Sequence, residues 1–118
     1  MRIQDVRDAL LTVLPGRVYH FTAPTEAADG REPYAVWGET SLGTAYGDDA
    51  PAEWAPSGMI YYYTPEEYDP TVDRIVLALA EAGISVSPGR IGWDERTNVI
   101  AYEIGWTVDC APGELYDE

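Results

Sequence analysis

The sequence predicts an α+β fold in which two helices pack on one face of a mostly antiparallel sheet, in the order α-β-β-β-α-β-β. Residues 3–14 and 64–83 carry apolar side chains at the spacing of amphipathic helices. Five other segments have the alternation or the β-branched and aromatic content of strands, and their links are mostly hairpin-like. The length of 118 residues fits a single domain over residues 1–118.

The N-terminal segment is expected to form a short helix followed by a strand. The apolar side chains of the helix share one side: Ile3, Val6, Leu10, Val13 and Leu14. Pro15 and Gly16 then end it. Residues 17–21 (RVYHF) are a predicted strand, and residues 23–33 are a predicted turn-rich connector without an apolar period.

The middle of the chain is predicted to hold two strands separated by a long loop. Residues 34–41 (YAVWGETS) would carry Tyr34 on one face and Trp37 on the other. A one-sided sheet in a monomer rarely needs aromatic residues on both faces, so one set is expected to meet another subunit. Residues 42–57 show neither the helical nor the strand spacing of apolar residues and predict a structureless loop with a functional or mobile role. A strand is predicted to follow at residues 59–63 (MIYYY).

The helix at residues 64–83 is the element around which the strands are organised. Thr64-Pro65 and Asp69-Pro70 are both start signals, so the segment has either two starts or a short turn before the true helix. The apolar stripe expected to face the sheet consists of Val72, Ile75, Val76 and Leu79, and Gly83 is the expected left-handed C-cap.

The C-terminal part predicts a hairpin and an acidic tail. Residues 84–93 and 98–108 are expected to pair around a polar turn at residues 94–97, and the second strand has the clearest alternation. The tail, residues 111–118, is expected to lie on the surface or to fray.

The charge balance limits the classes of partner. The net charge is −14, from 21 acidic residues against seven arginines, and lysine does not occur. Direct nucleic-acid binding is not expected, because it requires a cationic face. The acidic surface serves solubility, a partner with a basic face, or mimicry of DNA charge. A signal peptide and a membrane span are not expected, which predicts a soluble protein made in a cytoplasm.

No constellation of residues predicts an enzyme, a metal site or a cofactor site. His20 is the only histidine and has no orienting partner that the sequence identifies, so a hydrogen-bonded strand histidine is expected. Adjacent carboxylates such as Glu66 and Glu67 point apart on a regular element. The single cysteine, Cys110, excludes an intramolecular disulfide and is expected to be packed.

The order of several short motifs resembles the tail terminator, or tail-completion, proteins of long-tailed bacteriophages. These motifs are LPGRVYHF, PYAVWGE at residues 33–39, YTPEEYDPTVDRI at residues 63–75, and the hairpin IGWDERTNVIAYEIGW ending at Trp106. The resemblance covers nearly the whole chain.

The resemblance implies a structural virion protein of the tail or neck, assembled in the host cytoplasm. Such proteins form a ring, usually a hexamer, at the head-proximal end of the tail tube. The ring ends tube growth and joins the tail to the head connector. The implied partners are therefore other copies of the chain, the tail tube protein and the connector or stopper protein, with DNA only as passing cargo and no membrane. The family implies no catalytic residues and no cofactor.

Two readings from different classes stay open. The first is the terminator ring or an adjacent head-tail joining protein, and the second is a small acidic phage-encoded inhibitor, such as a DNA mimic. For a ring, whose contacts need two different patches on each subunit, the aromatic strands and the acidic loop supply the candidate contact residues. These residues are Trp37, Trp54, Tyr61, Tyr63, Asp48, Asp49 and Glu53.

Overall fold

The computed structural model describes residues 1–29, 31–47 and 50–116, with the backbone alone at residues 44–47 and 50–52. The helices are α1 (Gln4–Val13), α2 (Thr25–Asp29) and α3 (Thr71–Glu81). The strands are β1 (Val18–His20), β2 (Tyr34–Ser41), β3 (Thr44–Gly47), β4 (Ala50–Trp54), β5 (Ser57–Thr64), β6 (Ser85–Asp94) and β7 (Val99–Thr107).

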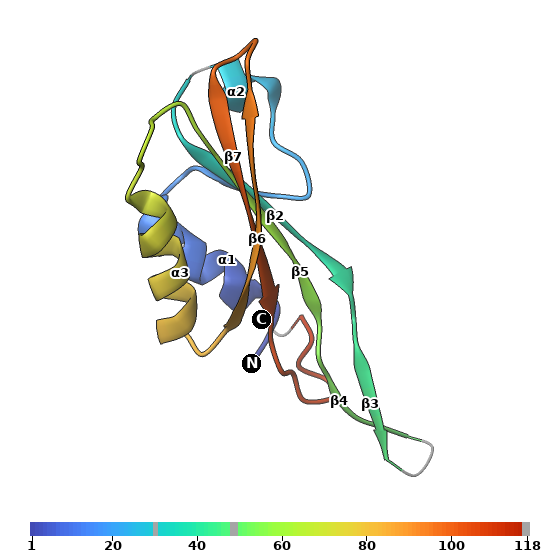
Figure 1. Cartoon of the computed structure of the whole chain (residues 1–118). Helices are drawn as coiled ribbons and strands as arrows, with labels where there is room; N and C mark the ends of the chain where they lie inside the picture. Colours follow the sequence, from blue (N-terminus) through green and yellow to red (C-terminus); the bar gives the residue numbers. More distant parts are fainter. Residues whose placement is uncertain (30, 48–49, 117–118) are drawn as a thin grey trace.

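The main sheet has five strands in the order β1-β2-β5-β7-β6. Only β1 and β2 pair in parallel, and the other neighbours are antiparallel. Helices α1 and α3 pack together on one face of this sheet, while the short α2 lies near the end of the β6–β7 hairpin (Figure 1). The predicted α+β architecture, with two helices on one face of a mostly antiparallel sheet, is therefore confirmed.

The core lies between the two long helices and the sheet. Strand β5 alternates strictly, and Ile60 and Tyr62 face the helices with no exposed surface. Their neighbours on β2 and β7, such as Trp37 and Ile104, extend the same buried layer because paired residues in an antiparallel ladder share a face. Leu10 of α1 is fully buried against this layer.

Helix α3 begins after a turn, which resolves the two alternatives left by the sequence. Thr64 ends β5, and its hydroxyl accepts a hydrogen bond from the Glu66 amide at 3.1 Å within the turn. Asp69 lies just before the helix, and its Oδ1 accepts from the amide of Thr71, the first helical residue, at 2.9 Å. The second start signal is therefore the true one, because it satisfies an amide that the helix itself cannot.

The end and the apolar stripe of α3 match the prediction. Gly83 has φ +83°, and the Ile84 amide donates to the Leu79 carbonyl at 2.9 Å, which is the 6→1 bond of a Schellman motif. Ile75 and Leu79 are fully buried, and Val72 and Val76 are partly buried against the core.

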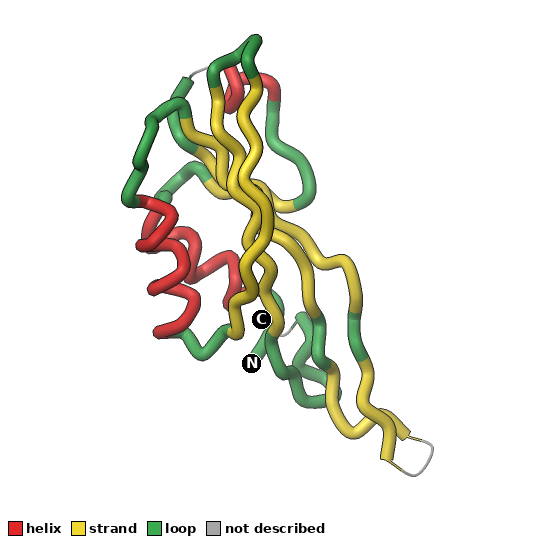
Figure 2. The backbone as a smooth tube through the Cα atoms, in the orientation of Figure 1, coloured by secondary structure: helices red, strands yellow, loops and turns green. Residues whose placement is uncertain are grey.

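Two predicted irregular segments contain regular structure. The connector at residues 23–33 includes α2, a five-residue helix too short to show an apolar period. The predicted structureless loop at residues 42–57 is wrong, because β3 and β4 form an antiparallel hairpin that extends away from the sheet as an arm (Figures 1 and 2). A two-stranded arm outside the main sheet is held by backbone hydrogen bonds, which leave no hydropathy period, and Pro51 argues against a strand.

The C-terminal tail is exposed but anchored. Residues 111–114 lie on the surface as predicted, whereas Leu115 packs against the core and its carbonyl accepts from the Ile3 amide at 2.9 Å. Cys110 is buried as expected, and burial raises the pKa of its thiol. Residues 117 and 118 lie outside the described residues.

Candidate interaction surfaces

The face of the sheet opposite α1 and α3 carries a cluster of tyrosines. The ring of Tyr34 stacks on the ring of Tyr63 at 5.0 Å between centroids, because the two residues are direct cross-strand partners. Tyr19 of β1 meets Tyr34 edge-on at 6.1 Å. All three side chains are half-buried, and burial raises the pKa of Tyr34 and Tyr63. The rings therefore offer neutral, amphipathic contact area.

From the tyrosine cluster, the same face of the sheet continues along β5 toward the arm. Tyr61 lies between its cross-strand partners Val36 and Glu103, and Met59 follows Tyr61 on this face. These side chains are half-buried. We call this surface, from Tyr34 and Tyr63 down to Met59, the open face.

A hollow of about 450 Å³ lies at the upper end of the open face. Its walls come from the segment after α2, which includes Arg31, from Tyr34 and Tyr63, and from Trp93 on the β6–β7 hairpin. The hollow is lined mainly by apolar atoms, so it keeps the two tyrosine rings accessible without assembling a polar reaction site.

Phe21 is an exposed aromatic residue in an unfavourable backbone conformation. Its φ is +69°, its side chain is 58% exposed, and its amide donates to the Trp37 carbonyl at 2.7 Å. The ring lies over Gly38, where an added Cβ would come within 2.6 Å of it. Phe21 is not among the predicted contact residues, although a glycine inside a strand is a signal of such a close approach. A left-handed bulky residue costs on the order of 1–3 kcal/mol, and such strain concentrates at functional positions.

His20 has an orienting partner that the sequence did not reveal. Its Nε2 lies 2.5 Å from Oε1 of Glu39, its ring stacks on Trp37, and the hydroxyl of Tyr116 donates to the other Glu39 oxygen. Burial tends to raise the pKa of Glu39, but the hydrogen bonds from His20 and Tyr116 outweigh it and hold that pKa below its usual value. The bond to Glu39 raises the pKa of Tyr116 to about 12, so the phenol stays neutral. The contact between Tyr116 and Glu39 therefore holds the tail against β2. Among His20, Glu39, Trp37 and Tyr116 there is no arrangement of a nucleophile and a base.

The predicted contact residues fall into three environments. Trp37 lies in the core with 3% of its surface exposed, because its strand face is the one that the helices cover, so it is not available for contact with a partner. Tyr61 and Tyr63 lie together on the open face. The structure does not bring Trp37 together with them.

The other predicted contacts lie on or near the arm. Glu53 is exposed near the end of β4. Trp54 is partly buried at the base of the arm, where its backbone exchanges hydrogen bonds of 2.8 and 2.9 Å with Cys110. Trp54 therefore connects the base of the arm to the C-terminal segment that contains Cys110. Asp48 and Asp49 lie outside the described residues.

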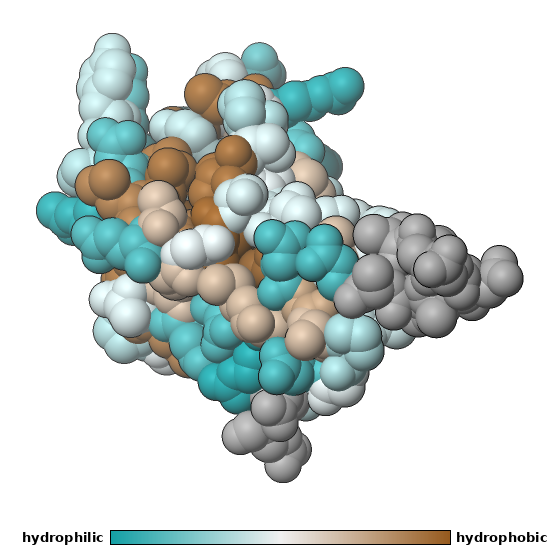
Figure 3. Space-filling view, turned by 90° about the horizontal axis from the view of Figure 1, so that it is seen from below, coloured by the Kyte–Doolittle hydropathy of each residue, from teal (hydrophilic) through white to brown (hydrophobic). Residues whose placement is uncertain are grey.

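Exposed apolar side chains also occur away from the open face. Seen from below, hydrophobic residues gather on the side where α1 and α3 lie, among hydrophilic ones (Figure 3). Leu77 of α3 is 60% exposed. Within the described part of the chain, no group of histidine, cysteine and carboxylate side chains could hold a metal ion, and no helix is long and apolar enough to cross a membrane.

Comparison with known proteins gives matches among solved structures. No protein-family model matches the chain, and no curated protein does so. Among solved structures, the chain is similar to a chain of the virion of the native gene transfer agent (GTA) particle. The TM-score is 0.65 at 13% sequence identity, and the likeness covers 93% of this chain and 95% of the other. Almost the whole chain therefore has a fold that is also found in a virion particle.

Proposed function

We propose that this chain is a structural protein of a virion, and more specifically a tail terminator. It would form a ring at the head-proximal end of the tail tube, end tube growth, and join the tail to the head connector. The observation that carries the proposal is the fold shared with a chain of the GTA virion over 93% of one chain and 95% of the other. The order of sequence motifs, which resembles tail terminators over the same length, adds the specific role.

The surfaces of the molecule suit a ring. A closed ring of identical subunits, proposed here as a hexamer, needs two different patches on each subunit. The open face offers Tyr61, Tyr63 and Tyr34 as rigid aromatic contacts, which are typical interface residues. The arm extends from the opposite end of the sheet, and we propose that it contacts the tail tube protein or the connector (Figure 1).

The charge suits a channel through which DNA passes. A net charge of −14 makes lasting contact with phosphates unfavourable. If part of this charge lines the ring, DNA moves past as cargo without adhering. In this role the protein has no catalytic activity and no cofactor, and it resides in the tail or neck of the virion after assembly in the host cytoplasm.

Assembly of the purified protein tests this function. Because the subunits repel each other, rings are expected to form only with added salt or on a tube template. Sedimentation velocity across a salt series, followed by electron microscopy, is expected to show closed rings. Tyr61→Ser on the open face is expected to weaken ring formation, whereas Leu77→Ser on the outer side of α3 serves as the matched control and is expected to leave it intact.

Two outcomes would refute the terminator. One is a protein that stays monomeric under all these conditions and also fails to bind tube ends. The other is tight inhibition of a nucleic-acid-binding enzyme by the monomer, which would favour the acidic-inhibitor reading.

A further inference from the structure

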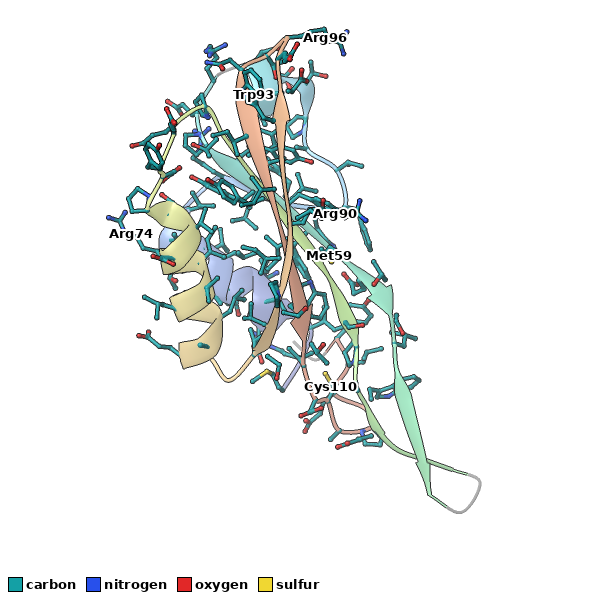
Figure 4. All side chains as sticks on the ribbon, viewed as in Figure 1. Met59, Arg74, Arg90, Trp93, Arg96 and Cys110 are labelled. Atoms are coloured by element: carbon teal, nitrogen blue, oxygen red, sulfur yellow. The ribbon has the colours of Figure 1, made fainter. Side chains whose placement is uncertain are left out.

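The free edge of the sheet at β6 exposes large apolar side chains. Among the strands that the structure describes, β6 pairs only with β7, which leaves its outer backbone edge without a neighbouring strand. Ile91 is 71% exposed and Trp93 is 61% exposed, because the hairpin extends beyond the two long helices (Figure 4). Tyr68, 88% exposed and with φ +59°, lines a second hollow together with Ile91 and Trp93.

The polar group of Trp93 is already satisfied within the hairpin. Its Nε1 donates to Oδ1 of Asn98 at 3.2 Å. The indole therefore presents mainly its apolar surface to the outside. Between Pro88 and Ile91 the ladder is interrupted by a bulge, which divides the free edge into two regular stretches, residues 85–88 and 91–94. The stretch that carries Ile91 and Trp93 is thus short, as expected for a specific contact rather than open-ended pairing.

The arginines divide into those that form an ion pair within the chain and those that do not. Arg2, Arg7 and Arg17 pair with carboxylates of their own chain. Among the described residues, the other four arginines form no ion pair within 4.0 Å: Arg31, Arg74, Arg90 and Arg96.

Three of these four arginines belong to or touch the β6–β7 hairpin. Arg90 lies in the β6 bulge, Arg96 lies in the hairpin turn, and Arg31 donates to the Thr97 carbonyl. Arg74 lies near the start of α3, as Figure 4 shows. We define the edge patch as Tyr68, Arg90, Ile91, Trp93 and Arg96.

We propose that the edge patch binds a second copy of this chain. The inference rests on the proposed function, in which copies of the chain form a ring, and it assigns one of the two patches that such a ring needs. The patch combines exposed aromatic area with unpaired guanidinium groups, and its partner must therefore supply apolar cover and carboxylates. A second copy supplies both, since the chain has 21 acidic residues against seven arginines and half-buried tyrosines on its open face.

Sedimentation velocity over a concentration series tests the assignment, at one ionic strength high enough to screen the repulsion between subunits. The wild type is expected to self-associate. Two paired variants, Ile91→Ser with Trp93→Ser and Arg90→Glu with Arg96→Glu, are expected to associate at least about tenfold more weakly, a loss typical of interface anchors. Leu77→Ser is the matched control, because its side chain is as exposed as that of Trp93 but lies on α3. Thermal melting checks that each variant is folded.

Hydrogen exchange gives a second measurement that needs no variant. The amides of residues 91–94 are expected to exchange more slowly in the associated wild type than in the dilute protein. A short single-stranded oligonucleotide is the competing probe, because unpaired arginines beside an indole also suit nucleic acid. No binding is expected, and specific binding that the patch variants abolish would overturn the proposal.

The remaining outcomes separate this inference from the proposed function. Association that is equal in the wild type and both patch variants, or a wild type that stays monomeric at every concentration, would overturn the edge patch as a self-contact. Association through the patch into pairs or open chains would support the patch and contradict the terminator ring.

Discussion

Replacing Leu79 by alanine tests the packing of α3 on the sheet. Leu79 has no exposed surface and lies in the stripe that faces the core. Such a substitution removes buried area and leaves a cavity, at a cost of about 2–5 kcal/mol. For a chain of this length, each kcal/mol lowers the melting temperature by roughly 4 °C, so the expected fall is about 8–20 °C.

The matched control is Leu77→Ala, two residues away on the same helix. Leu77 is 60% exposed, and alanine is at least as good a helix former as leucine, so a change within about 0.5 kcal/mol is expected. Urea unfolding and thermal melting of the two variants provide the comparison. Equal effects at both positions would mean that α3 does not present this face to the sheet.

Three further predictions concern other parts of the structure. Burial opposes ionisation of Asp69, but hydrogen bonds from Tyr62 and the start of α3 outweigh it and hold its pKa below the unfolded value of about 3.9. The stabilisation is therefore present above that value and lost as pH falls through the folded pKa. Asp69→Asn is expected to lower the free energy of unfolding at neutral pH and to weaken its fall as the pH becomes acidic. Urea unfolding at a series of pH values measures this. The same pH dependence in the variant and the wild type would contradict the prediction. Gly58→Ala would place a Cβ 1.9 Å from a β2 carbonyl oxygen, whereas Gly92→Ala meets nothing within 4 Å, so only the first should lower the melting temperature. Tyr116→Phe removes the bond to β2 and should speed amide exchange in the tail without changing global stability, and unchanged exchange would show that this bond does not hold the tail.

The elements that bury one face were predictable from the sequence. The stripe of α3 repeats at helical spacing because Ile75 and Leu79 must both reach the core, and Gly83 follows because the chain needs a left-handed residue there. The hairpin, with its turn predicted at residues 94–97 and found at residues 95–98, was predictable for a similar reason, since alternate residues of its second strand, such as Ile104 and Trp106, reach the core.

The arm and the tail contacts could not be predicted from hydropathy. The arm lies outside the main sheet and needs no period, and its base is fixed by backbone bonds between Trp54 and Cys110, which are 56 positions apart in the chain. Likewise, His20 and Glu39 meet only because β1 pairs in parallel with β2. Such pairing between distant segments leaves no local signature.

The candidate contact surface was partly predictable. The alternation in residues 34–41 indicated that aromatic residues occupy both faces of one strand, but it did not say which face the helices cover. The helices cover Trp37 and leave Tyr34 on the open face. Ile91 and Trp93 form part of an ordinary-looking strand, and their exposure depends on how far the hairpin extends beyond α3, a property of the tertiary structure.

The most direct test of the terminator is the length of tails assembled with and without the protein. Tube subunits are assembled in both conditions, and tail lengths are measured by electron microscopy. With the protein, a narrow length distribution is expected, with a ring at the end that joins heads. Without it, tubes of uncontrolled length that fail to join heads are expected. Tails of normal length that join heads in its absence would contradict the account.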